Sequence, residues 1–208
     1  MKPYKIRYNF FLIFLILFSA CSVFQWEKDV EQNGIRFVKI RHIEPSGTII
    51  GKTEQNFQTD SFVVEKGWVH FYPNWSLKTF LTAEPLLVGT MSLPAKSWIF
   101  LDSIGIVSHC VLPQDQEIQG ILCRGGGGVS GITTSFYRSG RLKSCYPSED
   151  IRIDGIPCSS NIFVPVGLYE NGLLRSCRLA DPITRSGKTF GKGTRIAISP
   201  DGTISEIN

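Results

Sequence analysis

The sequence predicts an all-β fold, a tandem array of about six β-hairpin units of 28–35 residues, shaped as an elongated sheet or a solenoid-like stack. Three observations predict it. A turn recurs at nearly constant intervals, apolar residues hold the same positions around each turn, and no useful stretch after residue 31 shows helical periodicity. Hydrophobic residues make up 42% of the 208, which suffices for a packed core. Because each unit is small, we expect it to bury its apolar face against its neighbours.

The chain begins with the layout of an export signal. Three bases and no acid lie in residues 1–9, and a run of nine apolar residues, Phe10–Phe18, follows them. A membrane-spanning helix needs roughly 20 apolar residues, so the run is short for one, although an uncleaved anchor stays an alternative. We therefore expect three parts: a lipoprotein signal peptide over 1–20, a lipidated N-terminus and tether over 21–35, and a β-hairpin domain over 36–208.

The end of the apolar run, Leu17-Phe18-Ser19-Ala20-Cys21, resembles the lipobox of bacterial lipoproteins, with one departure at Phe18. The resemblance implies that Cys21 is acylated and becomes the mature N-terminus. Each buried CH₂ contributes about 0.8 kcal/mol, so several acyl chains would hold the protein on a membrane. Ser22 after the cysteine implies the outer rather than the inner membrane of the cell envelope. The alternative is that Cys21 is an ordinary cysteine.

Six turns carry the hairpin prediction, each with one anchoring residue. The residue four before the anchor and the residue two after it are apolar in all six copies. The anchors are Gly47, Trp75, Gly105, Gly140, Gly172 and Gly202. The first apolar column is Ile43, Phe71, Leu101, Phe136, Leu168 and Ile198, and the second is Ile49, Leu77, Val107, Leu142, Leu174 and Ile204.

The turn residues predict how the strands pair. Sequences such as Pro200-Asp201-Gly202 suit a type I turn followed by a left-handed residue, where glycine tolerates a positive φ. With this three-residue loop the two apolar columns face each other across the hairpin and lie on one side of the sheet. Trp75 stands where glycine is expected, so we predict a different turn in that copy.

The cysteines repeat in phase with the turns. Cys110 and Cys123, and then Cys145 and Cys158, are each 13 residues apart, which predicts one disulfide within each unit and leaves Cys177 unpaired. Two alternatives stay open, namely bridges or burial of equivalent cysteines in adjacent units, and free buried thiols. A zinc site is disfavoured because the spacing lacks the short Cys-x₂₋₄-Cys pairs of structural zinc sites.

Blocks such as residues 112–123 and 148–158 recur between the hairpins, and we expect each to form a short strand and a turn that cross to the next unit. The run Tyr169-Glu-Asn-Gly-Leu-Leu-Arg-Ser-Cys177 resembles MORN-type and antitoxin-like Y-x-N-G-x-L repeats. Gly140–Cys145 with Ile153–Cys158 resembles repeats of uncharacterised bacterial lipoproteins, notably those of spirochaetes. The resemblance implies an extended β-sheet scaffold and assigns no catalytic residue.

The residues indicate a binding or structural protein of the envelope rather than an enzyme. No nucleophile, base or acid recurs in a catalytic pattern, and we expect no cofactor or metal. Three of the 22 bases lie in residues 1–21, so the rest is nearly neutral and nucleic acid is not an expected partner. A protein or glycan is the expected ligand. Tyrosines and nearby bases form the candidate binding face: Tyr72, Tyr137, Tyr169, Arg141, Lys143 and Arg175. The alternative function is an antitoxin- or immunity-like module that binds one protein partner.

Overall fold

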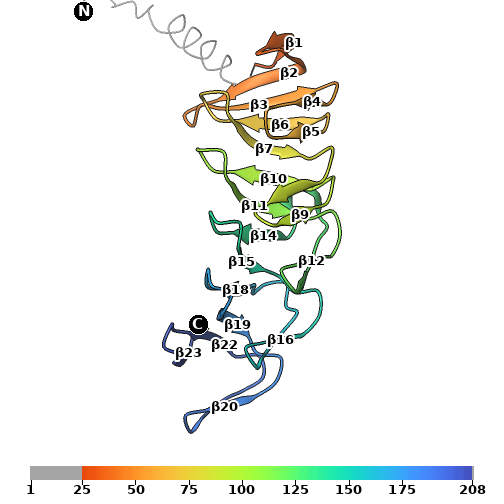
Figure 1. The fold of residues 1–208 in the computed structure, drawn as a ribbon. Coiled ribbons are helices and arrows are strands. Elements are labelled where there is room, and N and C mark those ends of the chain that lie inside the picture. Colours follow the sequence, from red (N-terminus) through yellow and green to blue (C-terminus); the bar gives the residue numbers. More distant parts are fainter. Residues whose placement is uncertain (1–24, 208) are drawn as a thin grey trace, which may run out of the picture.

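A computed structural model describes residues 25–207, so the expected signal peptide and Cys21 lie outside the described residues. The described chain is all-β, and its main feature is a 13-stranded antiparallel sheet that runs the length of an elongated molecule (Figure 1). The strands of this main sheet are β1 (Glu27–Gln32), β2 (Ile35–Ile43), β3 (Thr48–Thr53), β6 (Trp68–Phe71), β7 (Leu77–Leu81), β10 (Trp98–Leu101), β11 (Val107–Val111), β14 (Thr133–Phe136), β15 (Leu142–Cys145), β18 (Val166–Leu168), β19 (Leu174–Arg178), β22 (Arg195–Ile198) and β23 (Ile204–Glu206).

The order of strands in the main sheet follows their order in the chain. All six expected hairpins are present, from β2–β3 to β22–β23, and each lies beside the hairpin before it. β1 pairs with β2 through a turn at Asn33 and Gly34, both with positive φ. The sheet therefore begins at Glu27, before the expected start of the folded domain at residue 36.

The expected pairing of the two apolar columns is confirmed in five hairpins. Phe136 faces Leu142, for example, and a β-bulge follows directly, as the left-handed turn residue requires. The prediction is wrong for the first hairpin, where Ile43 faces Thr48 instead of Ile49. There the Ser46 hydroxyl donates to the carbonyl of Ile43 and accepts the N–H of Thr48, which closes the turn one residue earlier.

Trp75 does not produce a different turn, so that prediction is also wrong. Its φ of 65° is left-handed, and its N–H donates to the carbonyl of Tyr72 at 2.9 Å, just as the N–H of Gly140 donates to Tyr137. A left-handed residue other than glycine costs roughly 1–2 kcal/mol. The indole packs against Phe71 and Phe37, with ring centroids 5.5 and 6.2 Å away, and this packing offsets the cost.

The segments between hairpins form short hairpins of their own, which we call crossing hairpins. Where a strand and a turn were expected, two paired strands are found, joined in three cases by a two-residue turn with both φ angles positive, as at Asp154–Gly155. Their strands are β4 (Phe57–Gln58) and β5 (Val63–Val64), β8 (Leu86–Val88) and β9 (Met91–Leu93), β12 (Gln116–Ile118) and β13 (Ile121–Cys123), β16 (Ile151–Ile153) and β17 (Ile156–Cys158), and β20 (Ile183–Arg185) and β21 (Lys188–Phe190).

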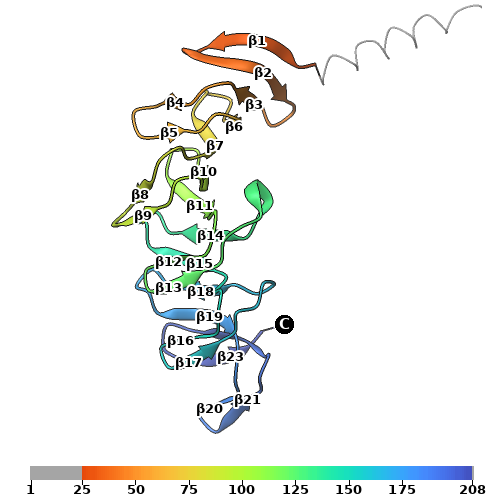
Figure 2. The same ribbon diagram turned by 90° about the vertical axis from the view of Figure 1, so that its right-hand side faces the viewer.

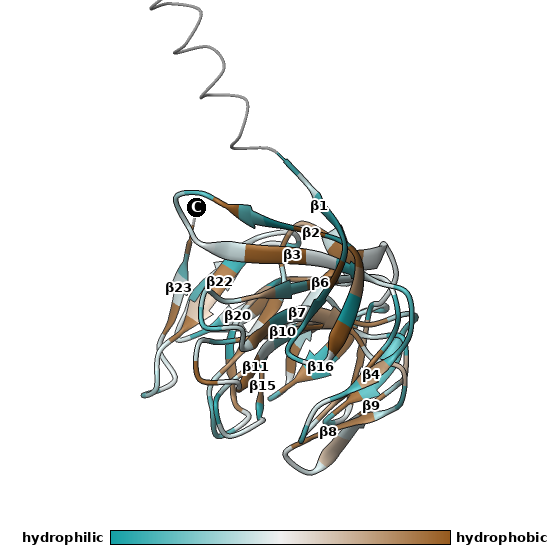
Figure 3. Cartoon of the chain, turned by 90° about the horizontal axis from the view of Figure 1, so that it is seen from above, coloured by the Kyte–Doolittle hydropathy of each residue, from teal (hydrophilic) through white to brown (hydrophobic). Residues whose placement is uncertain are grey.

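The crossing hairpins lie on one face of the main sheet, which we call the inner face (Figure 2). Between them and the sheet lies a continuous core, in which Ile99, Ile196 and Leu142 from the sheet meet Ile118 and Ile156 from the crossing hairpins. Seen along the long axis, hydrophobic and hydrophilic residues alternate along the strands, as a sheet with one covered face requires (Figure 3). The loop with the 3₁₀ turn η2 (Gly128–Ser130) extends on the opposite, outer side.

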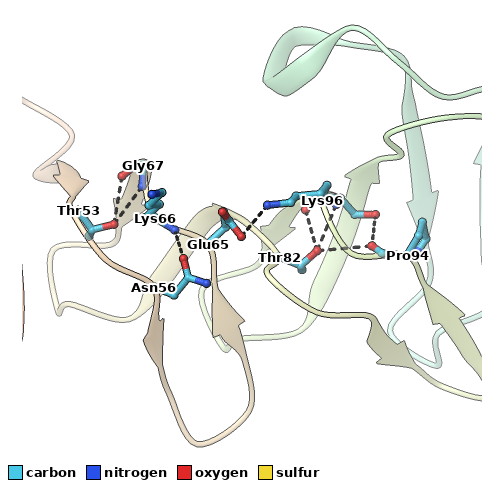
Figure 4. Close-up of polar contacts among 9 residues, drawn as sticks. Thr53, Asn56, Glu65, Lys66, Gly67, Thr82, Pro94 and Lys96 are labelled. Carbon is cyan, nitrogen blue, oxygen red and sulfur yellow. Dashed lines mark hydrogen bonds and ion pairs between the residues drawn. The ribbon is translucent and has the colours of Figure 1, made fainter.

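Backbone hydrogen bonds tie crossing hairpins to the main-sheet hairpin that follows. The N–H of Glu65 donates to Leu81, that of Arg124 to Tyr146, and that of Ser159 to Arg178, at 2.7–2.8 Å. Side chains add further ties around the first crossing hairpin (Figure 4). Asn56 accepts the N–H of Lys66 at 2.8 Å, and Glu65 forms an ion pair with Lys96 at 2.8 Å.

Candidate functional site

The three tyrosines of the expected binding face connect neighbouring hairpins. Each phenol donates a hydrogen bond to a main-chain carbonyl of the next main-sheet hairpin, and each ring is half-buried. The bonds are Tyr72 to Leu101 at 2.9 Å, Tyr137 to Leu168 at 2.8 Å, and Tyr169 to Ile198 at 2.7 Å. Because each hydroxyl donates to a carbonyl of the next hairpin, these tyrosines help to position neighbouring hairpins.

The bases of that face do not converge on one point. Lys143 Nζ lies 5.7 Å from the ring centroid of Tyr137, which brings these two predicted residues together. The guanidinium of Arg175 instead lies along the backbone of Gly167, and the exposed Arg141 reaches toward the turn at Gly172. Tyr137 and Lys143 therefore form a local pair, while the six residues do not line one shared hollow.

Replacing Tyr137 by phenylalanine should lower the free energy of unfolding by about 0.5–1.5 kcal/mol, the net contribution of one hydrogen bond. The loss arises because the carbonyl of Leu168 keeps its place but loses its donor. Urea denaturation measures it. Tyr146→Phe is the matched control, because among the described residues the Tyr146 hydroxyl makes no hydrogen bond. If both variants lose the same free energy of unfolding, the hydrogen bond from Tyr137 to Leu168 does not stabilise the contact between the two hairpins.

Other recurring polar side chains also serve the fold. Asp115 accepts the N–H of Gly125 at 2.9 Å, and Asp150 accepts the N–H of Ser160 at 2.7 Å, ten residues along in both cases. The turn residues of two crossing hairpins reach the next main-sheet hairpin in the same way. Gln119 Oε1 accepts the N–H of Leu142 at 3.1 Å, and Asp154 Oδ2 accepts that of Leu174 at 2.7 Å.

The expected disulfides, Cys110–Cys123 and Cys145–Cys158, are not formed in the structure. All five described cysteines, Cys177 included, are free and buried. The reason is the path of the crossing hairpins, whose second strand turns toward the following unit. The backbone of Cys123 forms an isolated β-bridge with Pro147, and its thiol forms a hydrogen bond with the thiol of Cys145. In the same way, the backbone of Cys158 pairs with Leu179, and its thiol forms a hydrogen bond with the thiol of Cys177. The nearest thiols thus belong to adjacent units, which was one of the open alternatives.

The pKa values of three buried thiols, Cys110, Cys123 and Cys158, are raised, which favours their protonated form. Burial raises the pKa of Cys110 from 9.0 to about 12. The pKa of Cys123 is raised by its hydrogen bond with Cys145 and then by burial, and Cys158 is affected in the same way through Cys177. A nucleophile or metal ligand must be a thiolate, so this environment is that of structural rather than reactive cysteines.

A hollow of about 1070 Å³ lies at the C-terminal end of the main sheet, between the last crossing hairpins and the last main-sheet turns. Where earlier crossing hairpins place Ile118 and Ile121 against the core, β20–β21 has Arg185 and Lys188, both exposed. The apolar filling of the earlier units is therefore missing here. Carboxylates such as Asp201 line the same hollow, so its charge is mixed.

The structure also assembles a cluster that the sequence analysis missed, on the outer face at the opposite end. Lys39 Nζ lies 4.8 Å from the ring centroid of Trp26 and 5.1 Å from that of Trp68. Arg41 packs on Trp26 at 4.5 Å, and the two indoles are 5.5 Å apart. These residues come from two strands, β2 and β6, and from the segment before β1. In the sequence, only the alternation of bases along residues 39–41, next to a predicted strand, indicated them.

Neither a metal centre nor a membrane-spanning helix is found in the part of the chain that the structure describes. No group of three or more histidine, cysteine or acidic side chains in residues 25–207 is placed to hold a metal ion. In that range no helix is long and apolar enough to cross a bilayer. No protein-family model, curated protein or solved structure matches the chain.

Proposed function

We propose that the protein is a lipid-anchored envelope protein in which a tandem β-repeat array serves as a non-enzymatic scaffold for binding or structure. One observation carries the proposal: polar side chains that recur in phase are used to join successive hairpins. Tyr137, Asp154 and their counterparts in other units each bond to the neighbouring hairpin. An array that uses its recurring polar groups in this way works by presenting a long surface, as repeat proteins do.

The anchor is proposed at Cys21, through acylation in the lipobox-like sequence. The sheet begins soon afterwards at Glu27, so the tether between lipid and folded domain would be short. A short tether would keep the array close to its membrane, with the outer membrane of the envelope as the proposed location.

The proposal is tested by labelling cells with a fatty-acid analogue and crosslinking in intact envelopes, using the wild type and Cys21→Ser. The wild type should take up label, fractionate with membranes and crosslink to envelope components. Cys21→Ser should lose the label and the membrane fraction while keeping its fold.

Three outcomes would overturn parts of this proposal. Label in Cys21→Ser, or none in the wild type, would refute acylation at Cys21. A single stoichiometric protein partner would favour the antitoxin- or immunity-like alternative over a scaffold. Turnover of an envelope polymer that one polar substitution abolishes would show an enzyme.

A further inference from the structure

The outer face of the first strands carries a row of like charges. Lys28 on β1 lies directly opposite Lys39 on β2, Lys39 opposite Lys52 on β3, and Lys52 opposite Trp68 on β6. Like charges directly across neighbouring strands are destabilising, so this row costs the isolated protein stability. Arg41, two residues from Lys39, adds a further base on the same side.

Nearby acids do not neutralise this row. In the described chain none of the three lysines has a carboxylate oxygen within 4.0 Å, which is the reach of an ion pair. Glu27 lies opposite the buried Ile40 and so points to the other side of the sheet. Glu31 is 4.0 Å from Arg36 and pairs with that base instead. The row therefore keeps its positive charge.

Two tryptophans stand among these bases. Trp68 is 39% exposed, although a large aromatic side chain gains most from burial. Arg41 packs on Trp26, and its buried Nε finds no hydrogen-bond partner in residues 25–207. We call Trp26, Lys28, Lys39, Arg41, Lys52 and Trp68 together the basic-aromatic face. The crossing hairpins lie on the inner face of the main sheet, on the other side from these residues (Figure 2).

The place of this face in the chain identifies its occupant. Trp26 is five positions after Cys21 in the sequence, and a fully extended chain spans at most about 3.6 Å per residue. Trp26 therefore lies within about 18 Å of the Cα of Cys21, whatever path the chain takes. If Cys21 carries acyl chains in a bilayer, Trp26 and the bases packed on its ring, Lys39 and Arg41, are close enough to reach the headgroups.

We infer that the basic-aromatic face docks on the anionic surface of the membrane that holds the lipid anchor. The inference rests on the proposed anchor at Cys21. Tryptophan favours the membrane–water interface because its ring is apolar and its N–H is polar. Each lysine near an anionic surface favours docking about fivefold, which corresponds to about 1 kcal/mol. Lipid phosphates relieve the repulsion within the lysine row, and the docked array lies against the bilayer at its N-terminal end.

The test uses the full-length protein reconstituted in vesicles that carry bromine high on the acyl chains, where it quenches interfacial tryptophan. Phosphatidylcholine vesicles with and without phosphatidylglycerol are compared. Quenching should be strong only in the anionic vesicles, and Trp26→Phe and Trp68→Phe should remove most of it. Lys39→Gln with Lys52→Gln should lower the ratio of docked to undocked protein about 25-fold while the protein still floats with the vesicles.

Lys188→Gln with Lys192→Gln is the matched control, since both lysines are exposed and lie near the other end of the main sheet. It should leave quenching unchanged. Protein that floats but shows the same quenching in both vesicle types would overturn the docking inference and leave the anchor intact. Protein that does not float would refute the anchor. Trp26 and Trp68 fluorescence that responds to a soluble acidic polysaccharide, but not to anionic vesicles, would assign the face to a glycan and overturn membrane docking.

Discussion

Gly140→Ala is expected to lower the free energy of unfolding by about 2–5 kcal/mol, far more than Gly105→Ala in the equivalent turn. Both glycines have a positive φ, 79° and 84°, so both substitutions carry the cost of about 1–2 kcal/mol for a left-handed alanine. Only Gly140 also touches another segment. A Cβ there would lie 3.0 Å from the Cα and N of Gly89, in the turn of the crossing hairpin β8–β9.

The clash at Gly140 is with backbone, so no side-chain rotation relieves it. Overpacking of this kind costs about 1–3 kcal/mol in addition to the strain of the turn. Around Gly105 no atom lies within 4 Å of the added Cβ, which makes Gly105→Ala a control for the strain alone. Urea denaturation of both variants gives the difference. Equal losses would show that the contact between the two turns adds nothing to stability.

The hairpins of the main sheet were predictable because they depend on local chemistry. Apolar alternation and a glycine at the turn specify both the strand and its register, as the pairing of Phe136 with Leu142 shows. β1 was missed although Asn33-Gly34 is a strong signal for a two-residue turn. The strand itself, Glu27–Gln32, is mostly charged and exposed. It lies at the edge of the sheet and buries little, so it lacks the apolar alternation by which the other strands were predicted.

Trp75 shows where local reasoning fails. A left-handed conformation is unfavourable for tryptophan, yet packing on Phe37 and Phe71 supports it. Residues 38 and 4 positions away in sequence create that packing, so no turn rule contains it. Tertiary contacts can therefore restore a turn that the sequence of the turn itself argues against.

The candidate site was harder to predict because its residues act between units. The tyrosine column was predicted as a binding face, and its hydrogen bonds could not be foreseen because each hydroxyl donates to a carbonyl about thirty residues away, in the next hairpin. The cysteines were in the right phase, but the path of a crossing hairpin decides which thiols meet. Cys123 approaches Cys145 because β13 continues into backbone pairing with residues 146–148. Spacing alone cannot show the direction in which a connection leaves its unit.

The buried thiols should make the fold sensitive to alkaline pH. The pKa of Cys110 is about 12 in the folded protein and near 9.0 when the thiol meets water. A pKa raised by folding gives stability that is complete below about pH 9 and is lost as the pH rises, because only the unfolded chain releases the proton. Each such thiol lowers the free energy of unfolding by about 1.4 kcal/mol per pH unit above pH 9. Cys123 and Cys158, whose pKa values are also raised, add to the slope.

Urea denaturation between pH 7 and about 10.5, with a reductant present, measures this slope. Cys110→Ala leaves a small cavity and lowers stability at every pH, but it should also make the alkaline slope shallower by about 1.4 kcal/mol per pH unit. The change of slope separates the loss of a titrating thiol from the loss of packing, because a cavity has no proton to release. Leu101→Ala, a substitution in the same core without a thiol, is the matched control and should keep the wild-type slope. If Cys110→Ala and Leu101→Ala show the same slope, the Cys110 thiol does not titrate differently in the folded and unfolded chains.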